Sequence, residues 1–172
     1  RVIVSTDCIQ IAEISKKNGA EVPFLRPKKY AQDYSTTESV LTHAIKKLGL
    51  DISKNETSIV LLQPTSPVRY ENSIDKAINR FETEKADSLV SVNTTKKFYW
   101  KNDLAVKPMY DINKRQMRQK LKKNEVFFVE NGSIYITKVK ILIKSNNRLG
   151  GKIALHEMLD NEAFEIDSVK DF

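Results

Sequence analysis

The chain has 172 residues, of which 40% are hydrophobic and 30% are charged, and its formal net charge is +7. This composition is typical of a globular domain with a sizeable core, and it excludes low-complexity and collagen-like chains. The apolar runs are too short for a membrane helix, no signal peptide opens the sequence, and the lone Cys8 excludes an internal disulfide, so we expect a cytoplasmic protein without a membrane partner.

The first part of the chain alternates short apolar runs with helical patterns. Residues 2–4 (VIV) predict a buried parallel strand, and the stripe that follows predicts a helix with Asp7 as its N-cap and Gly19 just past its end. Residues 35–38 (STTE) match the capping-box pattern and open a second helix, which Gly49 ends.

The pattern continues with strand, loop, helix and strand. Residues 57–62 (TSIVLL) predict a buried strand, and residues 63–67 (QPTSP) must end it because two prolines so close together exclude ladder pairing. Residues 74–81 carry apolar side chains at helical spacing, and residues 88–92 predict a third strand. This alternation predicts an α/β fold with a mostly parallel sheet and right-handed crossovers.

Residues 94–125 interrupt the alternation. They are polar, basic and aromatic in patches, and residues 114–123 carry six Lys and Arg with no acidic residue. We therefore predict an arm at 94–125, between an α/β core of residues 1–93 and a return to the core at residues 126–172. The expected elements of the return are strands at 126–129, 134–136 and 153–155, a helix at 139–143, and a segment at 164–167 that leads into a helix.

Two loops occupy the place where open α/β sheets bind ligands, which is the carboxyl end of a strand. They are residues 5–7 (STD) and residues 63–67 (QPTSP). The carboxamide and hydroxyls of the second loop suit hydrogen bonding to a base or a sugar at low ordering cost. The alternative interpretation of this loop is a rigid structural turn.

Several segments of the chain together resemble one enzyme family. They are VIVSTD (2–7), GAEVPFLRP (19–27), IVLLQPTSPVR (59–69), ADSLVSV (86–92), ENGSIYI (130–136), GGKI (150–153) and EIDSVKDF (165–172). In this order they resemble the N-acylneuraminate cytidylyltransferases, also called CMP-sialic acid synthetases. The resemblance implies a Rossmann-like α/β fold of the nucleotide-diphospho-sugar transferase type, with a protruding arm at 94–125 that makes a homodimer.

The resemblance also implies a reaction. The family transfers CMP from CTP to the anomeric oxygen of a nine-carbon, sialic-acid-type sugar acid and releases pyrophosphate, with Mg²⁺ present. Such an attack on the α-phosphorus needs positioning, a divalent cation and cationic side chains more than a covalent nucleophile. An alternative acceptor is pseudaminic, legionaminic or another ulosonic acid.

Two alternative interpretations of the chain belong to other functional classes. They are a basic nucleic-acid-binding module and an inactive dimeric scaffold. The chain has no interleaved stacking aromatics and no helix-turn-helix or RNA-recognition signature, so we expect no nucleic-acid partner.

The acidic pair Glu165 and Asp167 suits the metal role. Residues two apart in an extended segment point to one face, and Mg²⁺ is commonly held by one or two carboxylates with phosphates and waters. The family usually has Asp-Ile-Asp at this point, so the departure in this chain falls on Glu165 and not on Asp167. The alternative is a solvated acidic strand end.

The resemblance assigns further site residues. Catalytic roles fall on Arg115 and Gln63, and the fork of an arginine suits a carboxylate, although a solvated basic helix is the alternative for Arg115. The expected sugar-binding residues are Gln63, Thr65, Ser66, Arg115, Gln116, Asn131, Gly132 and Tyr135. The expected nucleotide-binding residues are Asp7, Ser35, Thr36 and Thr37. Core packing is the alternative for Tyr135, and helix capping is the alternative for Ser35.

The family's glycine-rich, lysine-bearing phosphate loop, which reads roughly as ARGGSKG, does not occur in these 172 residues. Such a loop supplies backbone N–H groups and a lysine to a triphosphate. We therefore expect that the natural N-terminus is missing and that these residues alone are inactive or nearly so.

Overall fold

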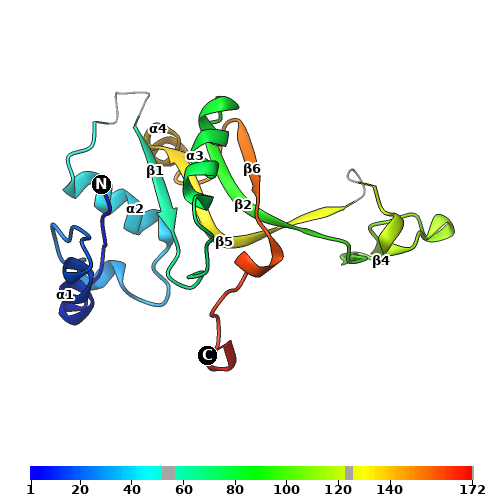
Figure 1. Ribbon diagram of the computed structural model, residues 1–172, viewed down its shortest axis with the longest axis horizontal. Coiled ribbons are helices and arrows are strands. Elements are labelled where there is room, and N and C mark those ends of the chain that lie inside the picture. The colour runs from blue at the N-terminus through cyan, green and yellow to red at the C-terminus, as the bar shows by residue number, and fades with distance from the viewer. Residues whose placement is uncertain (52–56, 123–125, 172) are drawn as a thin grey trace. The chain divides into compact units, whose positions relative to one another are not determined.

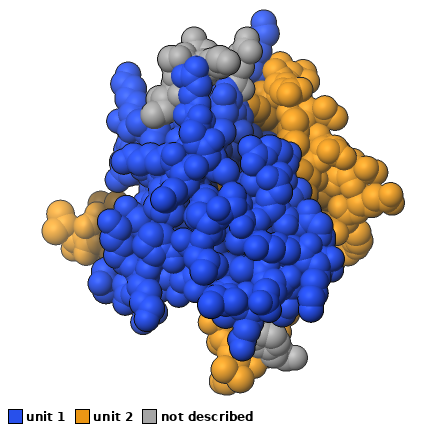
Figure 2. Space-filling model, turned by 90° about the vertical axis from the view of Figure 1, so that its left-hand side faces the viewer, with its two compact units in different colours: residues 1–60, 85–88, 136–153 blue, residues 61–84, 89–135, 154–172 orange. Residues whose placement is uncertain are grey.

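The computed structural model describes residues 1–51, 57–122 and 126–171. They form two compact units (Figure 2). Unit 1 consists of residues 1–60, 85–88 and 136–153, and unit 2 consists of residues 61–84, 89–135 and 154–172, apart from the residues outside the described ranges.

A four-stranded sheet contains β1 (Ser58–Leu62), β2 (Ser88–Thr95), β5 (Phe127–Lys138) and β6 (Ile153–Glu157), in the order β1-β5-β2-β6 (Figure 1). These ranges confirm the strands predicted near residues 57–62, 88–92 and 153–155. The two strands predicted at 126–129 and 134–136 are one continuous strand, β5.

The directions of neighbouring strands correct the expectation of a mostly parallel sheet. Asp87 N donates to Lys152 O, and Met158 N donates to Val92 O, so β2 and β6 run parallel. Lys138 N donates to Asp87 O, and the Ile134 amide reaches the Ser91 hydroxyl, so β5 runs antiparallel to β2. Among the described residues β5 also runs antiparallel to β1, which makes this an α/β fold with a mixed sheet. The prediction failed because periodicity reports burial and not strand direction.

The strand predicted at residues 2–4 is also wrong. Ile3 makes only an isolated parallel bridge with Glu21, and Val2 is 68% exposed. A run of β-branched residues favours extended backbone, but a strand also needs a neighbouring strand with which to pair. In unit 1 residues 2–4 find only the bridge to Glu21.

The helices of unit 1 are α1 (Ile9–Lys17), α2 (Thr37–Lys47) and α4 (Val139–Ser145), with the short η1 (Lys28–Tyr30). Their positions confirm the predicted helices, but two predicted caps are wrong. The N-cap of α1 is Cys8 and not Asp7, and Thr36, not Ser35, accepts the amide of Ser39 as the N-cap of α2.

In unit 2 the helix α3 (Ser73–Thr83) buries Ala77 and Phe81, as its apolar spacing predicts. β2 and β5 lead into the segment that holds the hairpin of β3 (Trp100–Asn102) and β4 (Val106–Pro108) (Figure 1). The short helices of this unit are η2 (Ile112–Lys114), η3 (Arg118–Lys120), η5 (Asp160–Glu162) and η6 (Val169–Asp171). Where a helix was expected to begin after residues 164–167, the described residues form the single turn η6.

The core follows the strands that are covered on both faces. Leu89, Val90 and Val92 on β2, and Ile134 and Ile136 on β5, are almost inaccessible to solvent. Within the described residues no helix is long and apolar enough to cross a membrane.

Candidate functional site

Three side-chain oxygens converge on the backbone of Gly132 in β5. Gly132 has φ +64°, and the position that a Cβ would take there lies 3.0 Å from Ser66 Oγ and 3.1 Å from Gln63 Oε1. The same position overlaps Glu165 Oε1. We call Gln63, Ser66, Gly132 and Glu165 the Gly132 cluster; all four lie in unit 2.

The cluster joins three segments that are far apart in the sequence. Gln63 and Ser66 belong to the proline-stiffened loop after β1, Gly132 lies within β5, and Glu165 lies in the irregular segment after η5. Ile166 N donates to Thr65 O at 2.8 Å, which fixes the acidic segment against the loop. The sequence therefore predicted the members of this site, and the structure brings them together.

Two buried polar residues at the Gly132 cluster, Ser66 and Asn131, have hydrogen-bond partners for their side chains. Ser66 is fully buried, and its hydroxyl donates to Asn131 O at 3.2 Å. The Asn131 side chain accepts from Ser91 Oγ and donates to Asn93 Oδ1, each at 2.6 Å. These hydrogen bonds hold Asn131 in the sheet, and Asn131 in turn fixes the backbone of its neighbour Gly132.

Arg69 also holds the loop of residues 63–67 in place. Its guanidinium donates to Ser133 O at 2.8 Å and to Gln63 O at 3.4 Å. Burial lowers the pKa of Arg69, although a guanidinium stays charged at neutral pH. Its Nε is buried without a partner in the described part of the chain.

The acidic segment carries two carboxylates whose charges repel. Partial burial, and after it the charge of Asp167, raise the pKa of Glu165 above its ordinary value. A cation near the pair would relieve this repulsion, and carboxylate and amide oxygens are ligands that Mg²⁺ prefers. The donor set of Glu165, Asp167 and Gln63 therefore fits Mg²⁺. No group of three or more His, Cys, Asp or Glu side chains that could hold a metal occurs among the described residues.

Of the other predicted sugar-site residues, Tyr135 is 4% exposed and donates its hydroxyl to Glu130 Oε2 at 3.0 Å. Thr65 is exposed and uses its carbonyl oxygen to hold Ile166.

The two arginines of the predicted arm, residues 94–125, differ in surroundings. The Arg115 guanidinium lies 4.9 Å from the ring centroid of Phe98 and 5.8 Å from that of Tyr110, as a cation–π pair. Arg118 lies 5.7 Å from Phe98 and also lines an open pocket of about 780 Å³. Gln116 is exposed beside them.

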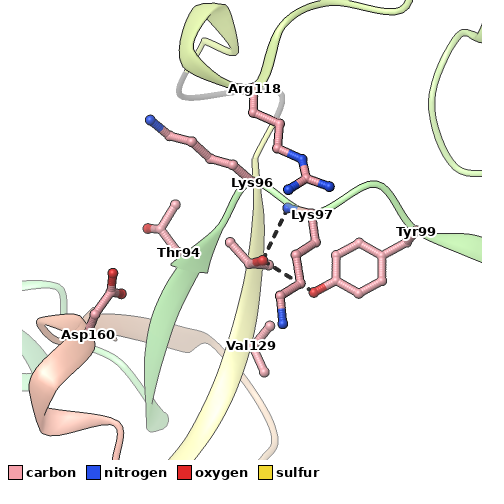
Figure 3. Close-up of a pocket in the computed structure, with 8 residues that line it drawn as sticks. Thr94, Lys96, Lys97, Tyr99, Arg118, Val129 and Asp160 are labelled. Atoms are coloured by element: carbon pink, nitrogen blue, oxygen red, sulfur yellow. Dashed lines mark hydrogen bonds between the residues drawn. The ribbon is translucent and has the colours of Figure 1, made fainter.

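This pocket, which we call the arm pocket, lies where β2 leads into the arm. Its lining residues are Thr94, Thr95, Lys96, Lys97, Tyr99, Arg118, Val129 and Asp160. The Thr95 hydroxyl accepts from Lys97 N at 3.2 Å and from the Tyr99 hydroxyl at 3.5 Å. Figure 3 shows the Arg118 side chain directed toward Lys97 and Tyr99, whereas Lys96 points away from them. The basic residues among those that line the pocket, Lys96, Lys97 and Arg118, outnumber the acidic Asp160, so its charge is predominantly positive, which suits an anion.

The predicted nucleotide-binding residues all belong to unit 1. Asp7 is exposed, and Thr36 caps α2 with Thr37 as the first helical residue. The Ser35 hydroxyl is engaged in its own loop, where it accepts from Gln32 N at 3.0 Å and donates to Lys29 O at 3.2 Å. A helix N-terminus favours an anion, and Thr37 lies in the first turn of α2.

Sequence reasoning missed Arg118, Lys97 and Glu162. The first two lie in a basic stretch in which no pattern distinguishes one cation from the next. Glu162 is only 4% exposed, and nothing in the sequence marks it apart from other acidic residues near the C-terminus.

Of three curated proteins similar to this chain, two are named for reactions of sugar acids and one is named for flagellin modification. The chain is 29% identical to an N-acylneuraminate cytidylyltransferase of Escherichia coli, over 100% of this chain and 40% of that protein. It is 30% identical to a CMP-N,N'-diacetyllegionaminic acid synthase of Legionella pneumophila, over 85% of this chain and 63% of that protein. It is 26% identical to a post-translational flagellin modification protein B of Campylobacter coli, over 99% of this chain and 73% of that protein.

These alignments cover between 40% and 73% of the relatives' own lengths. A family model described as "Cytidylyltransferase" matches residues 1–163, which is nearly the whole chain. The chain belongs to the cytidylyltransferase family.

Proposed function

We propose that the protein transfers CMP from CTP to the anomeric oxygen of a sialic-acid-type nonulosonic acid and releases pyrophosphate. The observation that carries this proposal is the convergence of Gln63, Ser66 and Glu165 oxygens on Gly132, in a chain of the cytidylyltransferase family. Relatives named for sialic and legionaminic acids support the acceptor class. A Rossmann-like arrangement of the complete protein, with Asp7, Ser35, Thr36 and Thr37 near the nucleotide, belongs to the same proposal.

The acidic segment is the proposed metal site. Asp167 and Glu165 would hold Mg²⁺ by their carboxylates, and Mg²⁺ when bound supplies neutralisation of the charge that grows on the phosphate oxygens. Gln63 can donate or accept through its carboxamide, so it would orient the acceptor sugar beside these carboxylates. Arg69 keeps the Gln63 carbonyl in place, which reduces the cost of ordering the loop.

The arm pocket is the proposed site for the carboxylate of the sugar acid. Arg118 and Lys97 supply positive charge there, and a guanidinium can bind a carboxylate through two parallel hydrogen bonds. Arg115, held over Phe98 and Tyr110, would support the same end of the arm with Gln116.

We also propose that residues 94–125 form an arm that pairs with a second copy of this chain. Large apolar side chains on the described part of this segment are exposed, among them Leu104, Val106 and Met117. A second copy of the arm would cover such side chains, as partners do at protein interfaces.

The experiment is pyrophosphate release from CTP and Mg²⁺, with the natural full-length protein that contains these residues and a panel of sialic, legionaminic and pseudaminic acids. Release with one acid, together with the matching CMP-sugar by mass spectrometry, supports the proposal and names the acceptor. Release with legionaminic acid alone would favour the alternative acceptor, to which the 30% identical relative points. No release with any acid would contradict the proposed reaction.

A further inference from the structure

Glu162, which no motif marks, carries a buried carboxylate that accepts three hydrogen bonds and lies three residues before Glu165. It is 4% exposed. Its Oε1 accepts from Tyr70 N at 2.9 Å and from the Ser73 hydroxyl, and its Oε2 accepts from Leu159 N at 3.2 Å. A buried carboxylate is costly unless it is hydrogen-bonded in this way.

The hydrogen bonds keep Glu162 ionised despite its burial. Burial by itself would raise the pKa of Glu162, but the hydrogen bonds from Ser73, Tyr70 and Leu159, aided by the charge of His156, together hold the pKa below its ordinary value. The carboxylate also faces the start of α3. There its carboxylate accepts from the hydroxyl of Ser73, the first residue of α3, and so brings the negative charge that a helix N-terminus favours.

Glu162 joins two of the three segments that build the Gly132 cluster. Its partners Tyr70 and Ser73 follow closely on the loop that holds Gln63 and Ser66, while Glu162 itself lies three residues before Glu165. The Asn161 side chain donates to the Tyr70 hydroxyl beside this junction.

The segment between Glu162 and Asp167 has one further backbone attachment to the loop, the hydrogen bond from Ile166 N to Thr65 O. Glu165 and Asp167 flank Ile166 directly. On its C-terminal side the segment is held by Asp171, whose carboxylate accepts from Asp167 N at 3.0 Å and from Ser168 N at 2.6 Å. On its N-terminal side, Glu162 is the residue whose side chain ties it to the residues that follow the loop.

We propose that Glu162 is a positioning residue, which sets the distance of the Glu165 and Asp167 carboxylates from the loop of residues 63–67. This inference rests on the proposed function of those carboxylates as magnesium ligands. A merely structural Glu162 would stabilise unit 2 without affecting the requirement for the metal.

The test uses Glu162→Gln in the natural full-length protein, with Glu82→Gln as the control, because Glu82 is an exposed glutamate on α3. Glutamine keeps the shape but removes the charge and one acceptor. We expect the amide of Ile166 to exchange its hydrogen about tenfold faster or more, because a hydrogen bond to a charged group contributes that much to holding the segment. We also expect the Mg²⁺ concentration for half-maximal rate to rise about tenfold, with the KM for CTP nearly unchanged and kcat recovered at saturating Mg²⁺.

Ser73→Ala removes a single donor to Glu162 and should give the same changes to a smaller extent, which keeps the test valid if Glu162→Gln fails to fold. Unchanged exchange at Ile166, or faster exchange across all of unit 2 with an unchanged Mg²⁺ requirement, would overturn the inference. If the wild-type protein releases no pyrophosphate with any acid, the proposed function fails, and the exchange rate of Ile166 still decides whether Glu162 fixes the segment.

Discussion

Gly132 and Glu165 approach so closely that a Cβ at position 132 would occupy the place of Glu165 Oε1. The glycine is therefore required twice, once for its positive φ of +64° and once for the space that its missing side chain leaves to the carboxylate. This contact joins the backbone of Gly132 in β5 to the acidic segment, and it brings two distant parts of the sequence together in the Gly132 cluster.

Gly132→Ala should remove activity and lower stability. The left-handed backbone costs an alanine about 1 kcal/mol or more, and the collision with Glu165, Ser66 and Gln63 adds roughly 1–3 kcal/mol. Gly49→Ala is the matched control, because Gly49 has φ +60° and open space around it, so it loses only the backbone contribution. Urea unfolding and pyrophosphate release measure the two effects. Equal loss of stability in both variants, with activity kept, would contradict the close packing at Gly132.

The raised pKa of Glu165 predicts a pH-dependent response to Mg²⁺. Below the ordinary value of 4.5 the protonated carboxyl imposes no penalty, and as pH rises through the raised pKa ionisation destabilises the folded protein. Mg²⁺ would offset that charge, so the gain in Tm on adding Mg²⁺ should be larger at pH 7 than at pH 4.5. Glu165→Gln should reduce this difference. A gain in Tm that is independent of pH, or unaffected by the variant, would exclude Glu165 as a ligand.

Arg118→Ala should weaken binding of the acidic substrate. Loss of a guanidinium from the arm pocket should raise the KM for the sugar acid about tenfold or more while leaving the KM for CTP nearly constant. Lys120→Ala is the control, since Lys120 is exposed on the same short helix and does not line the pocket. The proposal for the pocket fails if the two variants have the same KM for the acid.

His43 should make unit 1 sensitive to acid. The centroid of its ring lies 5.1 Å from that of the Phe24 ring and 4.8 Å from that of the Tyr30 ring. Neither nitrogen of the His43 ring has a hydrogen-bond partner among the described residues. Burial, and then the charges of Lys47, Lys29 and Arg26, lower the pKa of His43. The neutral ring is therefore favoured on folding, so its contribution to stability is present above the ordinary value of 6.5 and is lost as pH falls below it.

His43→Phe should flatten this part of the stability profile, because phenylalanine fills a similar space and does not titrate. Thermal unfolding of both proteins between pH 5 and pH 8, roughly the range in which histidine titrates, measures the effect. Parallel profiles for the two proteins would show that another group causes the acid sensitivity.

The sequence predicted most elements, because their signals are local. The spacing of Ala77 and Phe81 placed α3, and the prolines of residues 63–67 ended β1 where the structure ends it. The strand directions could not be predicted in this way, because the pattern of apolar residues in β5 is the same for parallel and for antiparallel pairing. The capping box at Ser35 failed because Thr36, one residue later, has an equivalent hydroxyl and captured the Ser39 amide.

The candidate site was predicted in its members but not in its geometry. Motif resemblance named Gln63, Ser66, Gly132 and Glu165, yet only the fold shows that the missing Cβ of Gly132 makes room for the other three. Glu162 could not have been predicted, because its importance comes from its burial against Tyr70 and Ser73, which lie about ninety residues earlier in the chain.

The most direct test of the account is the Mg²⁺ dependence of pyrophosphate release from CTP, measured with the natural full-length protein and its best acceptor acid. Asp167→Asn is compared with wild type and with Asp75→Asn, an exposed aspartate on α3. The account predicts a loss of at least about a hundredfold in rate for Asp167→Asn, since a metal-holding carboxylate is removed, and no loss for Asp75→Asn. A wild-type rate for Asp167→Asn at low Mg²⁺ would contradict the assignment of the acidic segment as the metal site.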